Sequence, residues 1–365
     1  MRRFIGPLAA VILVLACCSF ACPAQTSAGI TPGNLATPQT SNEVGEADGC
    51  PRLIEFSGEQ AEPADLKFPD VSGRVLIYYW SELEPKDGRF DFSAMDREIS
   101  TWTNAGKAVV LRFSAAGWTK WKEPWSQQGT PEWAYKKYRI SRVIEVDRAI
   151  LPVYWDEGYQ AGLREFLRAV SEHIQTSSYR GKVAFIELAA GDGGETKPDT
   201  EQNKTPEQRA VRLALWQKAG YTNVLWYQAI RGTIASYKAA FPSIPLALMP
   251  DSSFLGGECT LPDGECREKT ILALAKDEGL ALQDNGFDRT HLYPAEWHGG
   301  PLACEQRQSA TQMGYPLEDD LEQSVKADCA WLLVFRQDLQ RPEFQQQVDH
   351  FYQQCKVPDQ RRPLR

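Results

Sequence analysis

Residues that can carry acid–base chemistry or contact sugars follow many of the short apolar runs in this chain of 365 residues. Carboxyl groups can protonate or attack a glycosidic bond, and flat aromatic rings suit the faces of sugars. Gathered at one rim, such residues would form a carbohydrate-cleaving site. Those we expect in the site are Trp80, Arg112, Trp118, Glu195, Asp251, Asn285, Tyr293, Trp297 and Glu305.

The elements that must position these residues are eight apolar runs separated mostly by amphipathic stretches. Continuous apolar runs are typical of strands that are covered on both faces. We predict strands over 53–56, 75–79, 107–113, 182–188, 244–249, 280–283, 301–305 and 330–335. Helical spacing covers 93–105, 159–174, 206–241, 267–278, 317–329 and 342–355.

Eight such strand–helix units predict an α/β fold, a (β/α)8 TIM barrel, over residues 50–358. A doubly wound open sheet is the main alternative. It would carry a glycine-rich phosphate turn after the first strand, and Phe56-Ser57-Gly58-Glu59 does not match one. In a barrel, active groups lie just beyond the C-terminal ends of the strands, so the residues named above would share one rim.

The N-terminus has the pattern of an export signal. Arg2 and Arg3 precede an apolar run from Phe4 to Cys22, so we expect a signal peptide or lipoprotein leader over 1–24. Residues 14–17 (VLAC) loosely resemble a lipobox, and the run is long enough that an uncleaved membrane anchor stays open. Residues 25–49 have the composition of a flexible linker. These features predict a secreted or cell-envelope-associated protein, either periplasmic or lipid-anchored.

Six cysteines lie beyond the leader: Cys50, Cys259, Cys266, Cys304, Cys329 and Cys355. An even number in an exported chain favours disulfide bonds. Cys259 and Cys266 bracket a turn-rich loop that a short bridge could close, and the other pairings stay open. A zinc site is a weak alternative because the chain has no CxxC pair.

The charge balance bears on the partners of the protein. Forty Lys and Arg residues against 48 Asp and Glu residues give a net charge of −8. Binding to nucleic acid requires a basic surface, so we expect no nucleic-acid partner. A carbohydrate substrate and an N-terminal membrane tether are the partners that the sequence suggests, and it leaves the oligomeric state open.

Residues 79–93 (YWSELEPKDGRFDFS), together with Asp96, resemble a segment of a known enzyme clan. The pattern W-S-x-L-E-P-x-x-G-x-F-D-F-S-x-x-D is similar to that of β-galactosidase-like members of the clan of retaining (β/α)8-barrel glycoside hydrolases. Residues 130–133 (TPEW) resemble the T-P-x-W loop of the same proteins. The resemblance is strong over 75–135 and looser over the rest of 50–355.

This resemblance implies an acid/base glutamate after strand four and a nucleophilic glutamate after strand seven, which fall on Glu195 and Glu305. The nucleophile must stay ionised, which a nearby cation or hydroxyl donor favours, so Arg112 and Tyr293 are the candidates for that support. Trp80, Trp118 and Trp297 are the candidates for stacking on sugar rings. One departure is that many members have Asn-Glu where this chain has Gly194-Glu195. Glu187 competes for the acid/base role, but mid-strand we expect it to pair inside the barrel. Glu82 and Glu84 are expected to be structural.

The sequence therefore predicts a secreted glycoside hydrolase that cleaves a polysaccharide or oligosaccharide by a retaining mechanism with two glutamates and no cofactor. Three alternatives are a non-catalytic carbohydrate-binding barrel lipoprotein, a structural or adhesion lipoprotein of the cell envelope, and a metal-dependent hydrolase.

Overall fold

The computed structural model describes residues 50–56, 65–116, 129–144, 150–199, 205–251, 267–290 and 300–355. The leader and the linker predicted from the sequence lie outside these residues.

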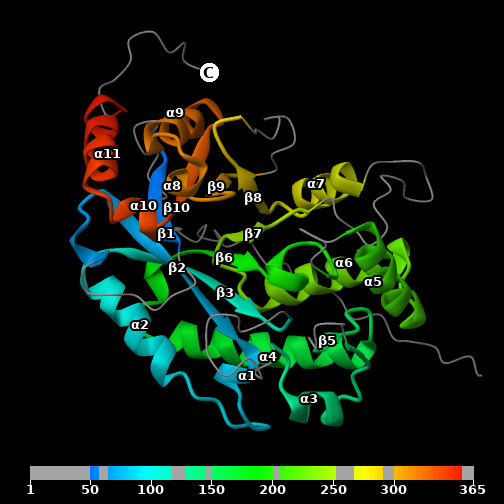
Figure 1. Ribbon diagram of the computed structural model, residues 1–365. Helices are drawn as coiled ribbons and strands as arrows, with labels where there is room; N and C mark the ends of the chain where they lie inside the picture. Colours follow the sequence, from blue (N-terminus) through cyan, green and yellow to red (C-terminus); the bar gives the residue numbers. More distant parts are fainter. Residues whose placement is uncertain are drawn as a thin grey trace, which may run out of the picture. The chain divides into compact units, whose positions relative to one another are not determined.

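Eight parallel strands form a closed barrel in the order β1-β10-β9-β8-β7-β6-β3-β2 (Figure 1). Their bounds are β1 (Arg52–Phe56), β2 (Val71–Tyr79), β3 (Ala108–Ser114), β6 (Val183–Leu188), β7 (Leu246–Leu248), β8 (Ala281–Phe287), β9 (Leu302–Gln306) and β10 (Cys329–Phe335). Each strand coincides with one of the eight predicted runs. The prediction of a (β/α)8 TIM barrel is confirmed, and the open doubly wound sheet is excluded because β1 closes onto both β2 and β10.

Helices follow most of the strands and lie on the outside of the barrel (Figure 1). They are α1 (Trp80–Leu83), α2 (Ser93–Asn104), α3 (Glu132–Lys137), α4 (Glu157–Thr176), α5 (Pro206–Lys218), α6 (Asn223–Ala240), α7 (Arg267–Asp277), α8 (Ala310–Met313), α9 (Leu317–Lys326), α10 (Arg336–Leu339) and α11 (Pro342–Cys355). A small antiparallel hairpin, β4 (Arg142–Ile144) and β5 (Ile150–Pro152), had no counterpart in the prediction.

The long helical region predicted over 206–241 consists of two helices. Helix α5 ends at Lys218, and Gly220 then adopts φ +89°, a left-handed conformation that stops a helix. Thr222 caps the next helix by accepting a hydrogen bond from the backbone N–H of Leu225. Apolar residues keep helical spacing on both sides of this break, so the sequence pattern gave no sign of it.

The inside of the barrel is filled by a separate cluster of apolar side chains. Successive side chains of a strand point to opposite faces, so one set packs inward and the other packs against the helices. The inward cluster, called the barrel floor below, consists of Ile54, Val75, Val110, Phe185, Ala247, Ala281, Ala303, Trp331 and Leu333. These residues are at most 4% exposed, so they form a solid base beneath the C-terminal ends of the strands.

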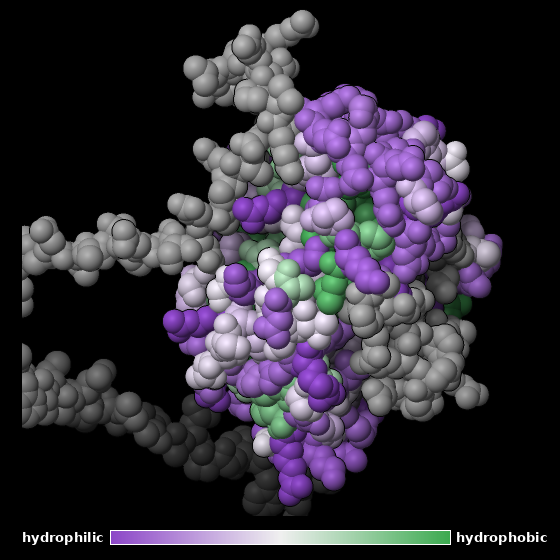
Figure 2. Space-filling view, turned by 90° about the vertical axis from the view of Figure 1, so that its left-hand side faces the viewer, coloured by the Kyte–Doolittle hydropathy of each residue, from purple (hydrophilic) through white to green (hydrophobic). Residues whose placement is uncertain are grey.

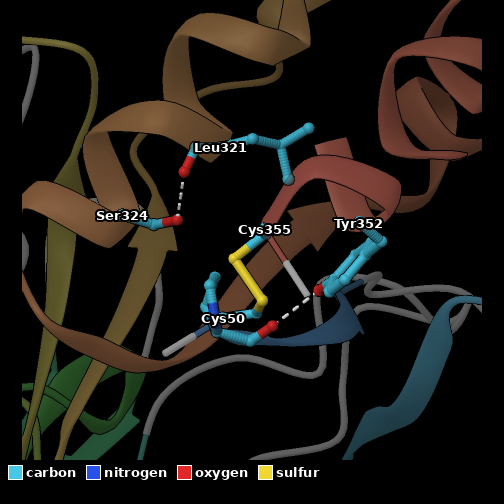
Figure 3. The surroundings of a disulfide bond; sticks show 6 residues. Cys50, Leu321, Ser324, Tyr352 and Cys355 are labelled. Atoms are coloured by element: carbon cyan, nitrogen blue, oxygen red, sulfur yellow. Dashed lines mark hydrogen bonds between the residues drawn. A yellow bond between two sulfur atoms is a disulfide. The ribbon is translucent and has the colours of Figure 1, made fainter. Parts of the chain in front are cut away.

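Two disulfide bonds join described cysteines. Cys50 and Cys355 connect the residues before β1 to the end of α11, with a Cα–Cα distance of 5.8 Å (Figure 3). Beside this bond, Tyr352 donates a 2.6 Å hydrogen bond from its hydroxyl to the carbonyl of Pro51. Cys304 on β9 and Cys329 on β10 form the second bond. The expectation of disulfides is confirmed for these four residues, while Cys259 and Cys266 lie outside the described part of the chain.

The surface seen in Figure 2 is predominantly hydrophilic, with hydrophobic residues confined to small areas between polar ones. The largest exposed apolar side chains among the described residues are Val211, Val224 and Met313, which are 40–50% exposed. None of the helices in the described ranges has the length and hydropathy that crossing a bilayer requires.

Candidate active site

Directly above the barrel floor, four polar side chains point into the barrel. They are Arg112 on β3, Glu187 on β6, Gln283 on β8 and Glu305 on β9. Each lies two residues after an apolar residue of the floor, so the two-residue period of a strand directs it to the same face. All four are buried. The sequence thus builds a polar layer at the C-terminal ends of the strands, where barrel enzymes carry their active groups.

Arg112 is the shared cation of this layer. Its Nε donates a 2.5 Å hydrogen bond to Oε2 of Glu187, which is completely buried. Its Nη1 donates to the carbonyl of Gly193 at 3.1 Å, and its Nη2 lies 3.6 Å from Oε2 of Glu305. Glu187 therefore pairs inside the barrel, as predicted, and Arg112 also reaches both the loop after β6 and the carboxylate on β9.

Two amide side chains connect Glu305 to Glu195. Nε2 of Gln283 donates to Oε2 of Glu305 at 2.7 Å and to Oδ1 of Asn285 at 3.1 Å. Nδ2 of Asn285 in turn donates to Oε1 of Glu195 at 3.2 Å. The two glutamates come from positions 110 residues apart in the sequence (305 − 195). The barrel nevertheless brings them to the ends of one short hydrogen-bonded chain.

The loop that carries Glu195 follows β6 and depends on its glycines. Gly193 and Gly194 have φ values of +67° and +94°, which side chains with a Cβ rarely adopt. A Cβ added to Gly194 would lie 2.7 Å from Cε of Met249 and 3.3 Å from Cδ of Arg112. The left-handed backbone at Gly194 disfavours the asparagine that many members of the clan carry at this position, which gives the Gly-Glu departure a structural reason.

Lys197 and Asp251 complete the surroundings of Glu195. The Lys197 ammonium forms an ion pair with Oε2 of Glu195, and it lies 2.9 Å from Oδ2 of Asp251 just beyond β7. The Lys197 side chain is only 7% exposed, whereas that of Glu195 is 20% exposed. Glu195 is also more open to solvent than Glu305, whose side chain is 10% exposed.

Burial and neighbouring charges set the protonation of Glu305. Burial raises the pKa of Glu305 to about 8, Arg112 opposes the shift, and the charges of Glu187 and Glu195 add to it. The influence of Glu195 shows that the two carboxyl groups lie within electrostatic reach. Burial acts against the charge of Lys197, but Glu195 and Asp251 outweigh it and raise the Lys197 pKa, so this residue is a cation at neutral pH.

Five of the nine predicted site residues come together in this arrangement: Arg112, Glu195, Asp251, Asn285 and Glu305. Trp118, Tyr293 and Trp297 lie outside the described residues. The sequence did not single out Lys197 or Gln283 as site residues. The two-residue period from Ala281 would have placed Gln283 inside the barrel, but Lys197 is a loop residue and no spacing rule points to it.

The expectation that Trp80 stacks on a sugar ring is contradicted. Trp80 is the first residue of α1 and is 0% exposed. Its ring stacks on Phe166 at a centroid distance of 5.3 Å and meets Trp133 edge-on at 5.9 Å. Its Nε1 donates to Oε2 of Glu84 at 2.8 Å, so both residues belong to the packing that anchors this turn.

Within the ranges that the structure covers, no group of three or more His, Cys, Asp or Glu side chains is arranged to hold a metal ion. The charged groups of the rim pair with one another instead.

Both the sequence and the fold of the chain resemble those of known proteins. Residues 71–149 match the β-galactosidase family of glycosyl hydrolases. The catalytic domain of a β-amylase from Paenibacillus polymyxa has a TM-score of 0.58 and 12% identity, over 87% of this chain and 100% of that one. A β-galactosidase from the psychrophilic Marinomonas ef1 has a TM-score of 0.50 and 10% identity, over 84% of this chain and 60% of that one. No curated protein sequence matches the chain.

At 10–12% identity, the two solved structures show that the fold is shared. The family match covers the whole segment over which the resemblance is strong, 75–135, including the WSELEP stretch after β2. The resemblance to β-galactosidase-like barrel glycoside hydrolases is therefore confirmed: the chain has the (β/α)8 barrel of glycoside hydrolases, and its residues 71–149 match the β-galactosidase family.

Proposed function

We propose that this protein is a secreted or cell-envelope-associated glycoside hydrolase that cleaves a polysaccharide or oligosaccharide with retention of configuration. The observation that carries the proposal is the convergence of Glu195 and Glu305 at the C-terminal ends of the strands, joined through Asn285 and Gln283. Hydrolysis of a glycosidic bond requires such a pair of carboxyl groups.

In this mechanism Glu195 is the general acid and base, and Glu305 is the nucleophile. In the first step Glu195 gives its proton to the glycosidic oxygen while the Glu305 carboxylate attacks the anomeric carbon, which forms a glycosyl ester and releases the leaving sugar. In the second step Glu195 takes a proton from water. The water oxygen attacks the anomeric carbon and breaks the ester bond to Glu305, so that both carboxyl groups return to their starting state.

The electrostatics of the site favour a proton on Glu305 at neutral pH. Burial raises the pKa of Glu305 to about 8, and the charge of Glu195 contributes to this shift. The proposed roles require this proton on Glu195 when the glycosidic oxygen is in place, with Arg112 stabilising the Glu305 carboxylate from 3.6 Å.

A retaining mechanism requires a separation of about 5–5.5 Å between the carboxyl groups. The short amide connection and the electrostatic influence of Glu195 on Glu305 support a small separation. Disulfide bonds form and persist in oxidising compartments, so the two bonds in the barrel support export, in agreement with the leader expected at 1–24.

The family match makes β-galactosides the first substrates to assay, followed by α-glucans and plant and microbial glycans. Glu195→Gln and Glu305→Gln should each lower kcat/KM by about 100- to 10,000-fold, since general acid–base catalysis alone contributes this much. Glu278→Gln removes the same charge from an exposed ion pair with Lys238 and should leave activity unchanged. Product anomers followed by NMR report retention directly.

Three results would contradict the proposal. Wild-type turnover that survives in both variants would remove the pair from the reaction, and an inverted product would exclude the covalent step. Sugar binding with no turnover on any glycan would instead indicate the carbohydrate-binding barrel.

A further inference from the structure

A buried lysine next to a catalytic carboxylate requires an explanation, because lysine is rarely buried unless it is paired. Lys197 lies two residues after Glu195, and its ammonium contacts Oε2 of Glu195 and Oδ2 of Asp251. Its side chain is 7% exposed. Lys197 therefore lies between two carboxylates that come from the ends of different strands, Glu195 after β6 and Asp251 after β7.

The backbone of the loop places Lys197 there. Asp192 donates its N–H to the carbonyl of Lys197 at 3.0 Å, which closes the turn that contains Glu195. Thr196 donates its N–H to the carbonyl of Met249 at 3.0 Å, and its hydroxyl oxygen accepts a 2.8 Å bond from the N–H of Asp251. These bonds attach the loop to the end of β7, so the contact of Lys197 with Asp251 follows from the fold of the loop.

The contacts of Glu195 show what the lysine achieves. Oε2 of Glu195 is held by Lys197, and Oε1 accepts from Nδ2 of Asn285. With both oxygens engaged, the plane and the direction of the carboxylate are fixed. Asp251 holds the ammonium from the other side, so neither Lys197 nor Glu195 is free to rotate away.

Lys197 also balances the charge of the site. The charged side chains of the rim are the carboxyl groups of Glu187, Glu195, Asp251 and Glu305 and the cations of Arg112 and Lys197. Without Lys197, Arg112 would be the only cation of this set, and it is bonded to Glu187. A second proton would then bind the remaining carboxylates more readily.

We propose that Lys197 is a positioning residue that orients the Glu195 carboxylate and tunes the pH at which it works, with Asp251 as its anchor. The inference rests on the proposed function, since Lys197 acts through Glu195. It assigns a role to a residue at which the sequence pattern of the clan gave no signal.

The test compares Lys197→Met with Lys197→Arg, which keeps the cation. Lys238→Met is the matched control, because Lys238 forms an exposed ion pair with Glu278. For each variant, kcat/KM is measured against pH with two glycosides of the same sugar, one with an acidic aryl leaving group and one with an alkyl leaving group that needs protonation.

We expect Lys197→Met to lower kcat/KM at the optimum by about 10- to 100-fold, the scale of a misplaced catalytic group. The loss should be larger for the alkyl glycoside, and the whole pH profile should move up by about one unit, because a neighbouring opposite charge has been removed. Lys197→Arg should restore most of the activity and the position of the profile, and Lys238→Met should match the wild type.

A loss of equal size for both leaving groups with no movement of the profile would show a merely structural role and overturn the proposal. If Lys197→Met does not fold, Asp251→Asn provides the second test. It leaves the lysine with one carboxylate, so the pH profile of kcat/KM should move to lower pH. A profile that stays in place contradicts the inference.

Should Glu195→Gln keep full activity, both this inference and the proposed function are wrong. Should Glu195→Gln be inactive while Lys197→Met behaves as wild type, only the role of Lys197 falls.

Discussion

Nη2 of Arg112 lies 3.6 Å from Oε2 of Glu305, close enough for its charge to act on the carboxylate but beyond hydrogen-bond distance. The closest bond of the guanidinium, 2.5 Å from its Nε, goes to Glu187 instead. Arg112 is thus oriented by one carboxylate and acts electrostatically on the other. This explains why burial still raises the pKa of Glu305 despite a nearby cation.

The raised pKa of Glu305 predicts the alkaline limit of activity. Below about pH 8 Glu305 holds a proton that can pass to the general acid, and above it Glu305 is ionised, so this proton is lost. We expect kcat/KM to fall tenfold per pH unit above about pH 8. Initial rates measured at low substrate concentration from pH 5 to pH 10 test this, and a rate that stays level to pH 10 would contradict it.

The same ionisation predicts how stability depends on pH. The folded protein binds more protons at Glu305 than the unfolded chain between about pH 4.5 and 8, so its stability falls as the pH rises through this window. Glu305→Gln removes the ionisation and should raise the free energy of unfolding at pH 8, by up to a few kcal/mol, with little change at pH 4.5. Urea unfolding at the two pH values measures this, and Glu278→Gln, at an exposed ion pair, is the control.

Arg112 should matter for stability and for activity in separable ways. Arg112→Met leaves the buried carboxylate of Glu187 without its cation, which should destabilise the fold by about 3–5 kcal/mol. Adding Glu187→Gln should recover much of that loss, because the unpaired charge is gone. Activity should stay low in the double variant, since Glu305 still lacks the cation. Recovery of both properties would show that Arg112 serves only to neutralise Glu187.

Gly194 offers a test of the space beside Arg112. Gly194→Ala combines a strained φ of +94° with a Cβ 2.7 Å from Met249. Gly279→Ala is the matched control, because Gly279 has φ +66° and no atom within 4 Å of the added Cβ. Gly279→Ala should lower stability by about 1–2 kcal/mol through backbone strain alone and leave activity intact. Gly194→Ala should also lower kcat/KM by about tenfold or more, because the added Cβ pushes on the side chains of Met249 and Arg112 beside the loop that carries Glu195. Equal kinetics in the two variants would contradict this.

Sequence reasoning predicted the barrel because each strand is buried on both faces and reads as a continuous apolar run. The polar layer was also within its reach, since Arg112, Gln283 and Glu305 keep the two-residue period of inward-facing neighbours on their strands. Predictions that depend on position along a strand therefore agreed with the structure.

Predictions failed where the chain leaves regular structure. Trp80 follows β2 as a rim residue would, but the chain turns into a helix at Trp80 itself and buries the ring. Lys197 reaches Glu195 through a turn with two left-handed glycines, a path that no hydrophobic pattern records. The boundary at Gly220 was hidden because apolar residues continue with helical spacing on both sides of it.

The bond between Cys50 and Cys355 has a consequence for how the domain could be rebuilt. It turns the chain from 50 to 355 into a covalent macrocycle, so that one peptide-bond scission inside it yields a nicked molecule rather than two separate pieces. The first and last described residues, 50 and 355, already meet there, next to the Tyr352–Pro51 contact. A circular permutant that fuses these ends and opens the chain elsewhere would therefore preserve every strand pairing of the barrel.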